Sequence, residues 1–280
     1  MRRRLGVRFA QVPGPAAFRN RGGDAMPSSS NSTDRIHGLT RAPEPHRMEK
    51  TEVIQAFIDG RGLETYLEIG VRTGHTFLRI RARRKIAVDP APRIGALKRL
   101  RWRFRNGSNR RSRIHRLTSD QLFARHGDLF AESGLGVAFV DGLHTYEQSL
   151  RDVENCLAHL EPEGVVLMHD CSPPSAAAAI PAHSPDEARR AAGDGWEGMW
   201  CGDVYKTILH LRSQRPDLRV CVLDCDRGIG IVERRTAERT LDLRVEEIAE
   251  IGYADLAAHR AEWLGLEPPE SLPDLVRPRS

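Results

Sequence analysis

The strongest constraint on the fold is the regular alternation of short apolar segments with longer amphipathic segments between residues 48 and 235. Five of the apolar segments have the length and the branched or aromatic residues of strands. They lie at residues 65–71, 85–90, 113–120, 135–144 and 164–172. Helical patterns separate them, and strands that alternate with helices indicate βα units whose strands lie parallel in one sheet.

Two further apolar segments, at residues 218–224 and 228–234, are separated by a short turn and predict an antiparallel hairpin. Together the segments predict an α/β fold. It is a Rossmann-like, doubly wound, mostly parallel seven-stranded sheet with a C-terminal antiparallel hairpin. In such sheets, ligands bind outside the carboxyl ends of the strands.

The composition divides the chain into three parts. Residues 1–47 are rich in Arg, Pro, Gly and Ser and show no periodicity, which predicts a disordered tail. Residues 48–235 carry the alternating pattern and form the predicted domain. Residues 236–280 are expected to be a helical extension, because apolar residues recur at helical spacing from Tyr253 to Leu264. This amphipathic helix could pack on its own domain or support a homodimer.

The overall composition excludes several classes of protein. No stretch approaches the roughly 20 apolar residues of a membrane-spanning helix, and the first residues lack the apolar segment of a secretory signal. Five cysteines, an odd number in a chain of 280 residues, argue against a disulfide framework. We therefore expect a cytoplasmic protein with no membrane partner.

Carboxylates mark the ends of the predicted strands. Glu68, Asp89, Asp120 and Asp141 belong to four consecutive strands, and Asp170 belongs to the fifth. An acid after a strand is often only a turn residue or a helix cap, so each one alone says little. Five at one edge of a parallel sheet predict a ligand crevice with negative charge.

The first predicted strand runs into a glycine turn with the sequence EIGVRTG, from Glu68 to Gly74. A dinucleotide fold uses G-x-G-x-x-G to hold a pyrophosphate, and the turn here is one residue shorter with an acid ahead of it. That acid would repel a phosphate and suits a cationic ligand, such as one with an amino group or a sulfonium. Asp89, twenty-one residues after Glu68, has the spacing to accept hydrogen bonds from a ribose diol.

Several motifs together resemble one family. ExGxxxG, with an acid closing the second strand, resembles the class I methyltransferases that use S-adenosylmethionine. FVDGLHTYEQSLRDVENCLAHLEPEGVVLMHD, WCGDVYKTILHLRSQRPDLRV and DRGIGIVER resemble the bacterial small-molecule O-methyltransferases of methyltransferase family 24. The resemblance covers about residues 50–235. It implies methyl transfer from S-adenosylmethionine to a hydroxyl of a small molecule, a sugar or a secondary metabolite.

The resemblance also implies cofactor-binding roles for residues at matching positions, which are Glu68, Gly70, Gly74, Asp89, Ser119, Asp120 and Asp141. The glycines would let the backbone approach the cofactor, and the acid before them would support the turn and the amino end of the cofactor. The acid of the second strand would hold the ribose, and the Ser-Asp pair would lie on the adenine side. The acid of the fourth strand would face the methionine part.

His144 and Asp170 are the catalytic candidates. His144 lies three residues past Asp141, and an imidazole with a pKa near its ordinary value of about 6.5 can take a hydroxyl proton at neutral pH. Methyl transfer from a sulfonium is an in-line displacement that mainly needs alignment of the reactants. The alternative for His144 is that it caps the helix that follows it.

A divalent cation is a further alternative. Some members of the wider family bind one through strand-end carboxylates, and Asp141 and Asp170 could hold Mg²⁺, which prefers oxygen ligands. The sequence has His169, Asp170 and Cys171 where metal-dependent relatives show two adjacent acids, which counts against Mg²⁺. A softer metal on His169 and Cys171 is left open.

Residues 79–116 are strongly basic, with thirteen arginines, two lysines and one acid. Trp102 and Phe104 lie among the arginines, a composition that suits RNA, so an RNA-binding protein or an RNA methyltransferase is the alternative function. A solvated helix and loop is the simpler interpretation, and we expect a small-molecule acceptor rather than a nucleic acid. The Pro-, Ala- and Gly-rich loop at 172–202 would cover that acceptor.

Overall fold

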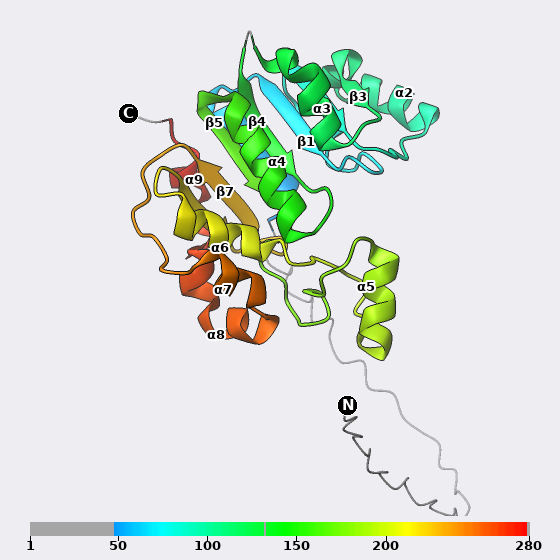
Figure 1. Cartoon of the computed structure of the whole chain (residues 1–280). Helices are drawn as coiled ribbons and strands as arrows, with labels where there is room; N and C mark the ends of the chain where they lie inside the picture. Colours follow the sequence, from blue (N-terminus) through cyan, green and yellow to red (C-terminus); the bar gives the residue numbers. More distant parts are fainter. Residues whose placement is uncertain (1–47, 132, 279–280) are drawn as a thin grey trace, which may run out of the picture. The chain divides into compact units, whose positions relative to one another are not determined.

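The structure, a computed structural model, describes residues 48–131 and 133–278. Its eight-stranded sheet has the order β3-β2-β1-β4-β5-β7-β6-β8. The strands are β1 (Thr65–Ile69), β2 (Arg84–Val88), β3 (Arg113–His115), β4 (Leu135–Val140), β5 (Leu160–Met168), β6 (Arg219–Leu223), β7 (Ile229–Glu233) and β8 (Leu266–Glu267). The first five strands pair in parallel, whereas β7 is antiparallel to both β5 and β6 (Figure 1).

The predicted α/β architecture and its closing hairpin are confirmed. The sheet has one strand more than the expected seven, because Leu266 and Glu267 pair in parallel with the end of β6. A strand of two residues has no alternation that a sequence pattern could reveal. The expectation of a disordered tail concerns residues 1–47, which lie outside the described residues.

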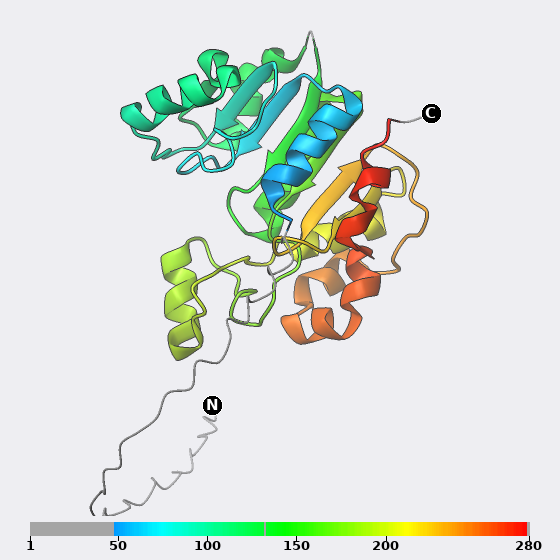
Figure 2. The same cartoon turned by 180° about the vertical axis from the view of Figure 1, so that it is seen from behind.

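Helices cover both faces of the sheet. Figure 2 shows α1 (Lys50–Arg61) lying across one face, with α9 (Leu272–Leu275) beside it. The opposite face carries α3 (Ser119–His126), α4 (Tyr146–His159) and α6 (Tyr205–Gln214) (Figure 1). Two more helices, α7 (Val245–Glu250) and α8 (Tyr253–Leu264), pack against α6. None of the helices in the described part of the chain combines the length and apolar character that a bilayer crossing requires.

Apolar residues at helical spacing explain how the flanking helices dock. In α1, Val53, Ile54, Phe57 and Ile58 are buried against the sheet, as their spacing in the sequence predicts. In α8, Leu256 and Leu264 are fully buried within the core that α4 and α6 share. The apolar face of α8 is therefore covered by its own chain.

The connection from β1 to β2 differs from the expectation. The helical pattern that separates the first two predicted strands, from Gly74 onward, indicated a helix, but residues 70–83 form turns only. Side chains instead bind the carbonyl groups that a helix would have used. The ammonium of Lys85 donates to the carbonyls of Phe77 and Ile80 and to the side chain of Asn109. Lys85 is 1% exposed, and burial lowers its pKa to about 7.

The switch point of the sheet lies between β1 and β4. From β1 the chain moves outward through β2 and β3 and then returns to the other side of β1 as β4. The connections on either side of β1 therefore diverge at its carboxyl end, which is where open α/β sheets bind their ligands. Gly70 and Asp141 follow β1 and β4 directly and so mark this position.

Candidate functional site

The glycine turn and the end of β4 meet at the switch point. Gly70 has a φ of +90°, and a Cβ at this position would lie 2.0 Å from the carbonyl oxygen of Asp141. Only glycine allows both this backbone conformation and this contact. The turn is held from the other side by Asp89, whose carboxylate accepts a 2.7 Å hydrogen bond from the backbone N–H of Arg72. The sequence-predicted residues Gly70, Asp89 and Asp141 thus converge, with Gly74 closing the turn.

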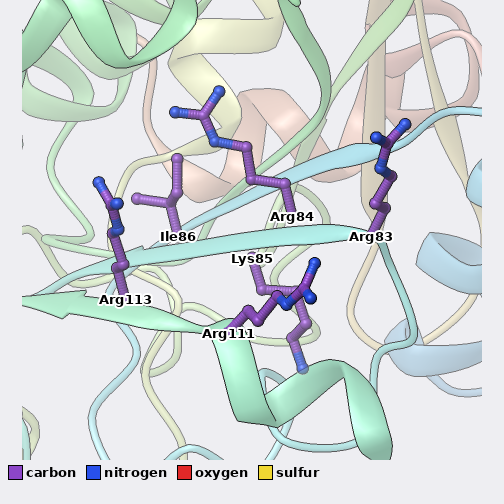
Figure 3. Close-up of a pocket in the computed structure, with 6 residues that line it drawn as sticks. All are labelled: Arg83, Arg84, Lys85, Ile86, Arg111 and Arg113. Atoms are coloured by element: carbon purple, nitrogen blue, oxygen red, sulfur yellow. The ribbon is translucent and has the colours of Figure 1, made fainter.

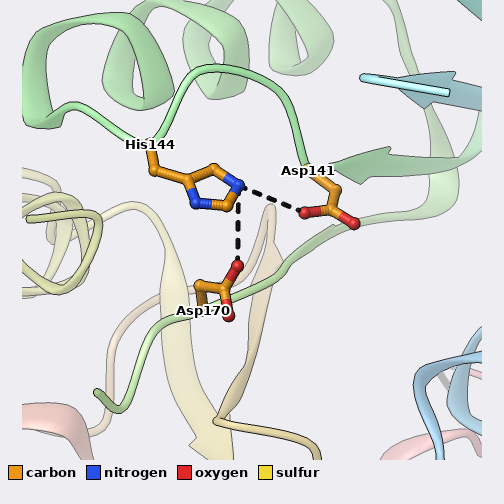
Figure 4. A group of neighbouring side chains, drawn as sticks. All are labelled: Asp141, His144 and Asp170. Carbon is orange, nitrogen blue, oxygen red and sulfur yellow. Dashed lines mark ion pairs between the residues drawn. The ribbon is translucent and has the colours of Figure 1, made fainter. Parts of the chain in front are cut away.

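Asp141, His144 and Asp170 form a compact group at this edge (Figure 4). The Nε2 atom of His144 lies 3.4 Å from Oδ1 of Asp141 and 3.5 Å from Oδ2 of Asp170. Its Nδ1 atom donates to the carbonyl of Trp200 over 3.1 Å. The imidazole is therefore fixed at both nitrogens, with Nε2 aimed at two carboxylates that come from the ends of β4 and β5.

The electrostatics of the group favour a protonated His144. Burial by itself would lower the pKa of His144. The hydrogen bond to Asp141 and the charge of Asp170 outweigh that effect and raise the pKa above its ordinary value. The sequence-predicted alternative, a helix cap, is taken by Thr145, whose hydroxyl accepts from the backbone of Gln148.

A second imidazole, His169, joins the same carboxylates. Its Nδ1 atom lies 3.1 Å from Asp170 and 3.3 Å from Asp141, and its Nε2 atom lies 3.5 Å from Asp226. Burial opposes protonation of His169, but the charges of these acids raise its pKa well above the ordinary value. Cys171, considered with His169 as a soft metal pair, instead donates weakly to the carbonyls of Met168 and His169.

Two permanent cations complete the cluster, and sequence reasoning missed both. The ammonium of Lys50, the first residue of α1, lies 2.8 Å from Oδ2 of Asp141. The guanidinium of Arg227 lies 2.7 Å from Oδ1 of Asp170. Asp226 and Arg227 form the β6–β7 turn, where both have positive φ values of 42° and 63°. In the sequence, these two residues indicated only a hairpin turn and gave no sign of a role in the site.

The charges in this cluster test whether the residues fit Mg²⁺. One ligand atom each from Asp141, His144 and Asp170 lie within 4.8 Å of one another. However, the two carboxylates already bind Lys50, Arg227 and the His169 imidazole. Mg²⁺ favours oxygen ligands in octahedral geometry, and here it would compete with two fixed cations. The residues therefore fit Mg²⁺ poorly.

Glu68 lies under the crevice rather than in it. It is 3% exposed and accepts a 2.6 Å hydrogen bond from the hydroxyl of Tyr66, two residues earlier on β1. Burial raises the pKa of Glu68 to about 8 despite this hydrogen bond. Glu68 is thus mainly uncharged at neutral pH, and the negative charge of the crevice comes from Asp141, Asp170 and Asp226.

Ser119 and Asp120 lie in the first turn of α3 and not at the end of a strand, because β3 ends at His115. The hydroxyl of Ser119 donates to Asp152 on α4 over 2.6 Å. Burial raises the pKa of Asp152 to about 6, an effect that this hydrogen bond partly offsets. Asp120 pairs with Arg151 at 3.7 Å. Within residues 48–131 and 133–278, no hydrogen bond or ion pair links Ser119 or Asp120 to Asp141, His144 or Asp170.

The segment at 172–202, expected to be a loop, contains the helix α5 (Pro185–Ala192) and a short 3-10 turn, Gly193–Gly195. Pro185 at the first helical position and the cap of Ser184 on Glu187 explain why a helix begins there. The ring of Trp200 lies 4.8 Å from the ring of His144, and its Nε1 donates to the carbonyl of Ile180. The end of this segment therefore forms one wall around His144.

Residues 67–171 match the family model described as "Methyltransferase domain". This match contains the glycine turn and the Asp141, His144 and Asp170 group. The curated proteins include no match to the chain.

The chain is also similar to solved structures of methyltransferases. The SAH-bound methyltransferase PaMTH1 from Podospora anserina is 18% identical, with a TM-score of 0.47, over 70% of this chain and 83% of that one. The O-methyltransferase from Bacillus cereus in complex with SAH is 16% identical, with a TM-score of 0.44, over 68% and 82%. Likenesses this remote carry no conclusion about activity. The match to a methyltransferase domain is thus confined to residues 67–171, the part of the chain that carries the glycine turn and the ends of β4 and β5.

Proposed function

We propose that this chain transfers a methyl group from S-adenosylmethionine to a hydroxyl of a small molecule, with His144 as the general base. One observation carries the proposal: the Nε2 atom of His144 points at Asp141 and Asp170 beside the glycine turn of a methyltransferase domain. The cofactor supplies an electrophilic methyl on a positively charged sulfur. The protein residues bind it, align the acceptor and remove the acceptor's proton.

Asp141 is the proposed anchor for the positive charge of the donor. It follows β4, contacts the backbone of Gly70 and has three basic neighbours, Lys50, His144 and His169. Its pKa is held well below the ordinary value: burial would raise it, but His169, His144 and Lys50 together outweigh burial. Asp141 thus keeps a full negative charge at neutral pH. A bound donor would share it with Lys50, whose ammonium now occupies Oδ2.

The atom of His144 that would accept the proton of the acceptor hydroxyl is Nε2. Because Nδ1 donates to the carbonyl of Trp200, the neutral imidazole would carry its lone pair on Nε2. In the proposed reaction, the acceptor oxygen forms the new bond to the methyl carbon as the sulfur–carbon bond breaks. The proton of the hydroxyl moves to Nε2. The raised pKa of His144 favours the protonated form of this atom in the free protein. A sulfonium beside Asp141 would oppose that charge and favour proton release.

We propose that the transfer does not depend on Mg²⁺. The carboxylates that would hold the metal are already engaged by Lys50 and Arg227, and an imidazole stands where oxygen ligands are preferred. Charge is neutralised rather than created when a hydroxyl attacks a sulfonium, so the reaction needs alignment more than a Lewis acid.

We also propose a cytoplasmic setting and a small-molecule acceptor. All five cysteines are free and buried, which suits a reducing compartment. The acceptor would lie against Trp200 and the remainder of the 172–202 segment, because this segment forms the wall beside His144.

Calorimetry on the purified chain tests the donor site. We expect the wild type and His144→Ala to bind S-adenosylmethionine and its demethylated product, and Asp141→Asn to bind both more weakly. Formation of the demethylated product with a panel of phenols, sugars and nucleotide-linked sugars then tests transfer. His144→Ala should lose about 10²-fold or more of any turnover while it retains donor binding. Failure of the folded wild type to bind either form of the donor would overturn the proposal.

A further inference from the structure

The helix α2 (Ala96–Arg105) presents large apolar side chains to solvent. Leu97, Leu100 and Phe104 are 79%, 52% and 78% exposed. Their spacing of three and four residues places them on one face of the helix. Trp102, in contrast, is partly buried against the core beneath α1 and anchors α2 to the domain. The exposed apolar face is therefore a rigid part of the fold.

Basic side chains border this apolar face. Lys98, Arg99, Arg101, Arg103 and Arg105 all belong to α2, which contains no acid. Within the described residues, none of these five has an ion-pair partner; Lys98 donates to the carbonyl of Thr73, and the guanidinium of Arg105 lies 5.9 Å from the ring centre of Trp102. A helix with an apolar face and a cationic border is typical of peripheral binding to anionic lipid surfaces.

The positive charge continues past the end of α2. Arg83, Arg84, Arg111 and Arg113 line a hollow of about 190 Å³ at the amino ends of β2 and β3. Arg84 and Arg113 are the first residues of these strands, and Arg83 and Arg111 lie just before them (Figure 3). Arg83 pairs with Glu64 at 2.7 Å. In the same described part of the chain, the other three have no ion-pair partner. These arginines form a second group of basic side chains, which follows α2 through the segment Gly107–Arg111 that contacts it.

We propose that α2 docks this protein on an anionic bilayer, with Leu97, Leu100 and Phe104 inserted among the lipid headgroups and the flanking arginines bound to lipid phosphates. Such a peripheral contact differs from a membrane span, and it revises the expectation that the protein has no membrane partner. Burial of exposed leucine and phenylalanine side chains supplies the apolar part of the interaction. Each arginine near an anionic surface adds an electrostatic part that salt weakens.

Other occupants fit the face less well. A second copy of α2 would bring five more positive charges against the same face, and residues 1–47, which net +6, would also be repelled. An RNA strand would match the arginines. However, only one of the three exposed apolar side chains, Phe104, offers a ring on which a base can stack, and Trp102 packs inward.

The position of α2 connects this surface to the ligand edge of the sheet. Lys98 donates a 2.8 Å hydrogen bond to the carbonyl of Thr73, within the turn between Gly70 and Gly74. A ten-residue helix is about 15 Å long. Docking through α2 would therefore hold the glycine turn within about one helix length of the bilayer surface.

Vesicle flotation with the full chain tests the proposal. We expect the wild type to float with vesicles of phosphatidylcholine and phosphatidylglycerol, but not with phosphatidylcholine alone. The bound fraction should fall as NaCl rises from about 0.1 M to about 0.5 M. The double variant Leu97→Ser/Phe104→Ser should bind at least about tenfold more weakly. Both residues are exposed, so its thermal unfolding should match that of the wild type.

Val245→Ser, which removes a 41% exposed apolar side chain far along the chain from α2, is the matched control and should bind like the wild type. Two outcomes of the vesicle experiment would overturn the proposal. One is that the wild type ignores anionic vesicles at low salt. The other is that Leu97→Ser/Phe104→Ser binds as tightly as the wild type, because the contact would then be one of charge alone. Tight binding of single-stranded RNA without binding to vesicles would also overturn it, in favour of a nucleic-acid surface.

Discussion

Gly202 and His144 touch through their backbones: a Cβ at position 202 would lie 1.9 Å from the carbonyl oxygen of His144. Gly202 also has a φ of +64°, which disfavours any residue with a side chain. The backbone N–H of Gly202 donates to the carbonyl of Ala178, so neither partner can move without disturbing the wall beside His144. The position of the proposed base thus depends on a residue 58 positions later in the chain.

We predict that Gly202→Ala lowers turnover at least about tenfold, because the added methyl displaces His144 from its position. It should also reduce the free energy of unfolding by about 1–3 kcal/mol through backbone strain. Gly198→Ala is the control, since Gly198 has a φ of +80° but open space where a Cβ would lie. Equal losses of activity in the two variants would show that strain in the segment, and not contact with His144, limits turnover.

The protonation of His144 should respond to the charge of the donor. We predict that, in NMR titrations of the imidazole, the free protein shows a pKa above the ordinary value, because burial is outweighed by Asp141 and Asp170. S-adenosylmethionine, which carries a sulfonium, should lower this pKa, whereas the neutral-sulfur product should lower it less. An identical shift with both ligands would contradict a direct electrostatic effect of the sulfonium on His144.

Chelators should leave the transfer reaction unchanged. Lys50 and Arg227 already bind the carboxylates of Asp141 and Asp170. The negative charge of these acids is therefore balanced without a divalent cation. We expect the rate with EDTA to stay within about twofold of the rate with added Mg²⁺ or Mn²⁺, a difference of less than about 0.5 kcal/mol. A loss of activity with EDTA that Mg²⁺ restores would show that a metal displaces these cations in the working enzyme.

Glu68 should make the protein less stable as pH rises. Burial raises the pKa of Glu68 from 4.5 to about 8 in the folded chain. Between these values, the folded state holds a proton that the unfolded state has lost, so the free energy of unfolding falls with pH. The contribution is on the order of 1 kcal/mol per pH unit.

Glu68→Gln keeps a hydrogen-bond acceptor for Tyr66 without the titration. The variant should therefore gain stability relative to the wild type as pH rises from about 5 to about 8. Denaturant unfolding at several pH values measures the difference. Parallel pH profiles for the two proteins would mean that Glu68 is already ionised in the folded state.

Lys85 should be needed for stability although it lies away from the proposed site. Lys85→Met would leave the carbonyls of Phe77 and Ile80 and the side chain of Asn109 without this donor. We predict a loss of about 3 kcal/mol or more in the free energy of unfolding, because buried acceptors without partners are costly. Lys98→Met removes one exposed hydrogen bond and should cost less than about 1 kcal/mol. Similar losses would contradict a special role for the buried ammonium.

The sequence predicted those parts of the fold that depend on periodic burial. The alternation of apolar segments gave the parallel sheet and its hairpin, because each strand must bury both faces beneath helices. It also brought Asp141, His144 and Asp170 together, since the carboxyl ends of neighbouring parallel strands share one edge. The glycine turn could be recognised from its residue pattern. Glycine stands at position 70 because the contact with Asp141 leaves no room for a side chain.

The remaining features depend on contacts that have no local pattern. Lys50 reaches Asp141 from 91 residues away, and Arg227 reaches Asp170 from a turn that looks like any other hairpin. The helix expected after Gly74 is replaced by turns because Lys85, together with Asn106 and Asn109, binds its carbonyls. The neutral state of Glu68 follows from its burial, which its position in the sequence does not reveal.

Hydrogen bonds join both ends of the 172–202 segment to the rest of the domain. The hydrogen bonds described for residues 183–197 stay within the segment. At its start, Tyr253 and Arg260 of α8 bind the carbonyl of Pro174 and the hydroxyl of Ser172. At its end, the carbonyl of Trp200 accepts from His144 and the thiol of Cys201 donates to Asp170. Substitutions in and around α5 would therefore change the proposed acceptor side of the site without changing the residues of the proposed donor side. On the proposed function, exchange of this one stretch during evolution would change which hydroxyl compound is methylated, while the residues that bind the methyl donor stay the same.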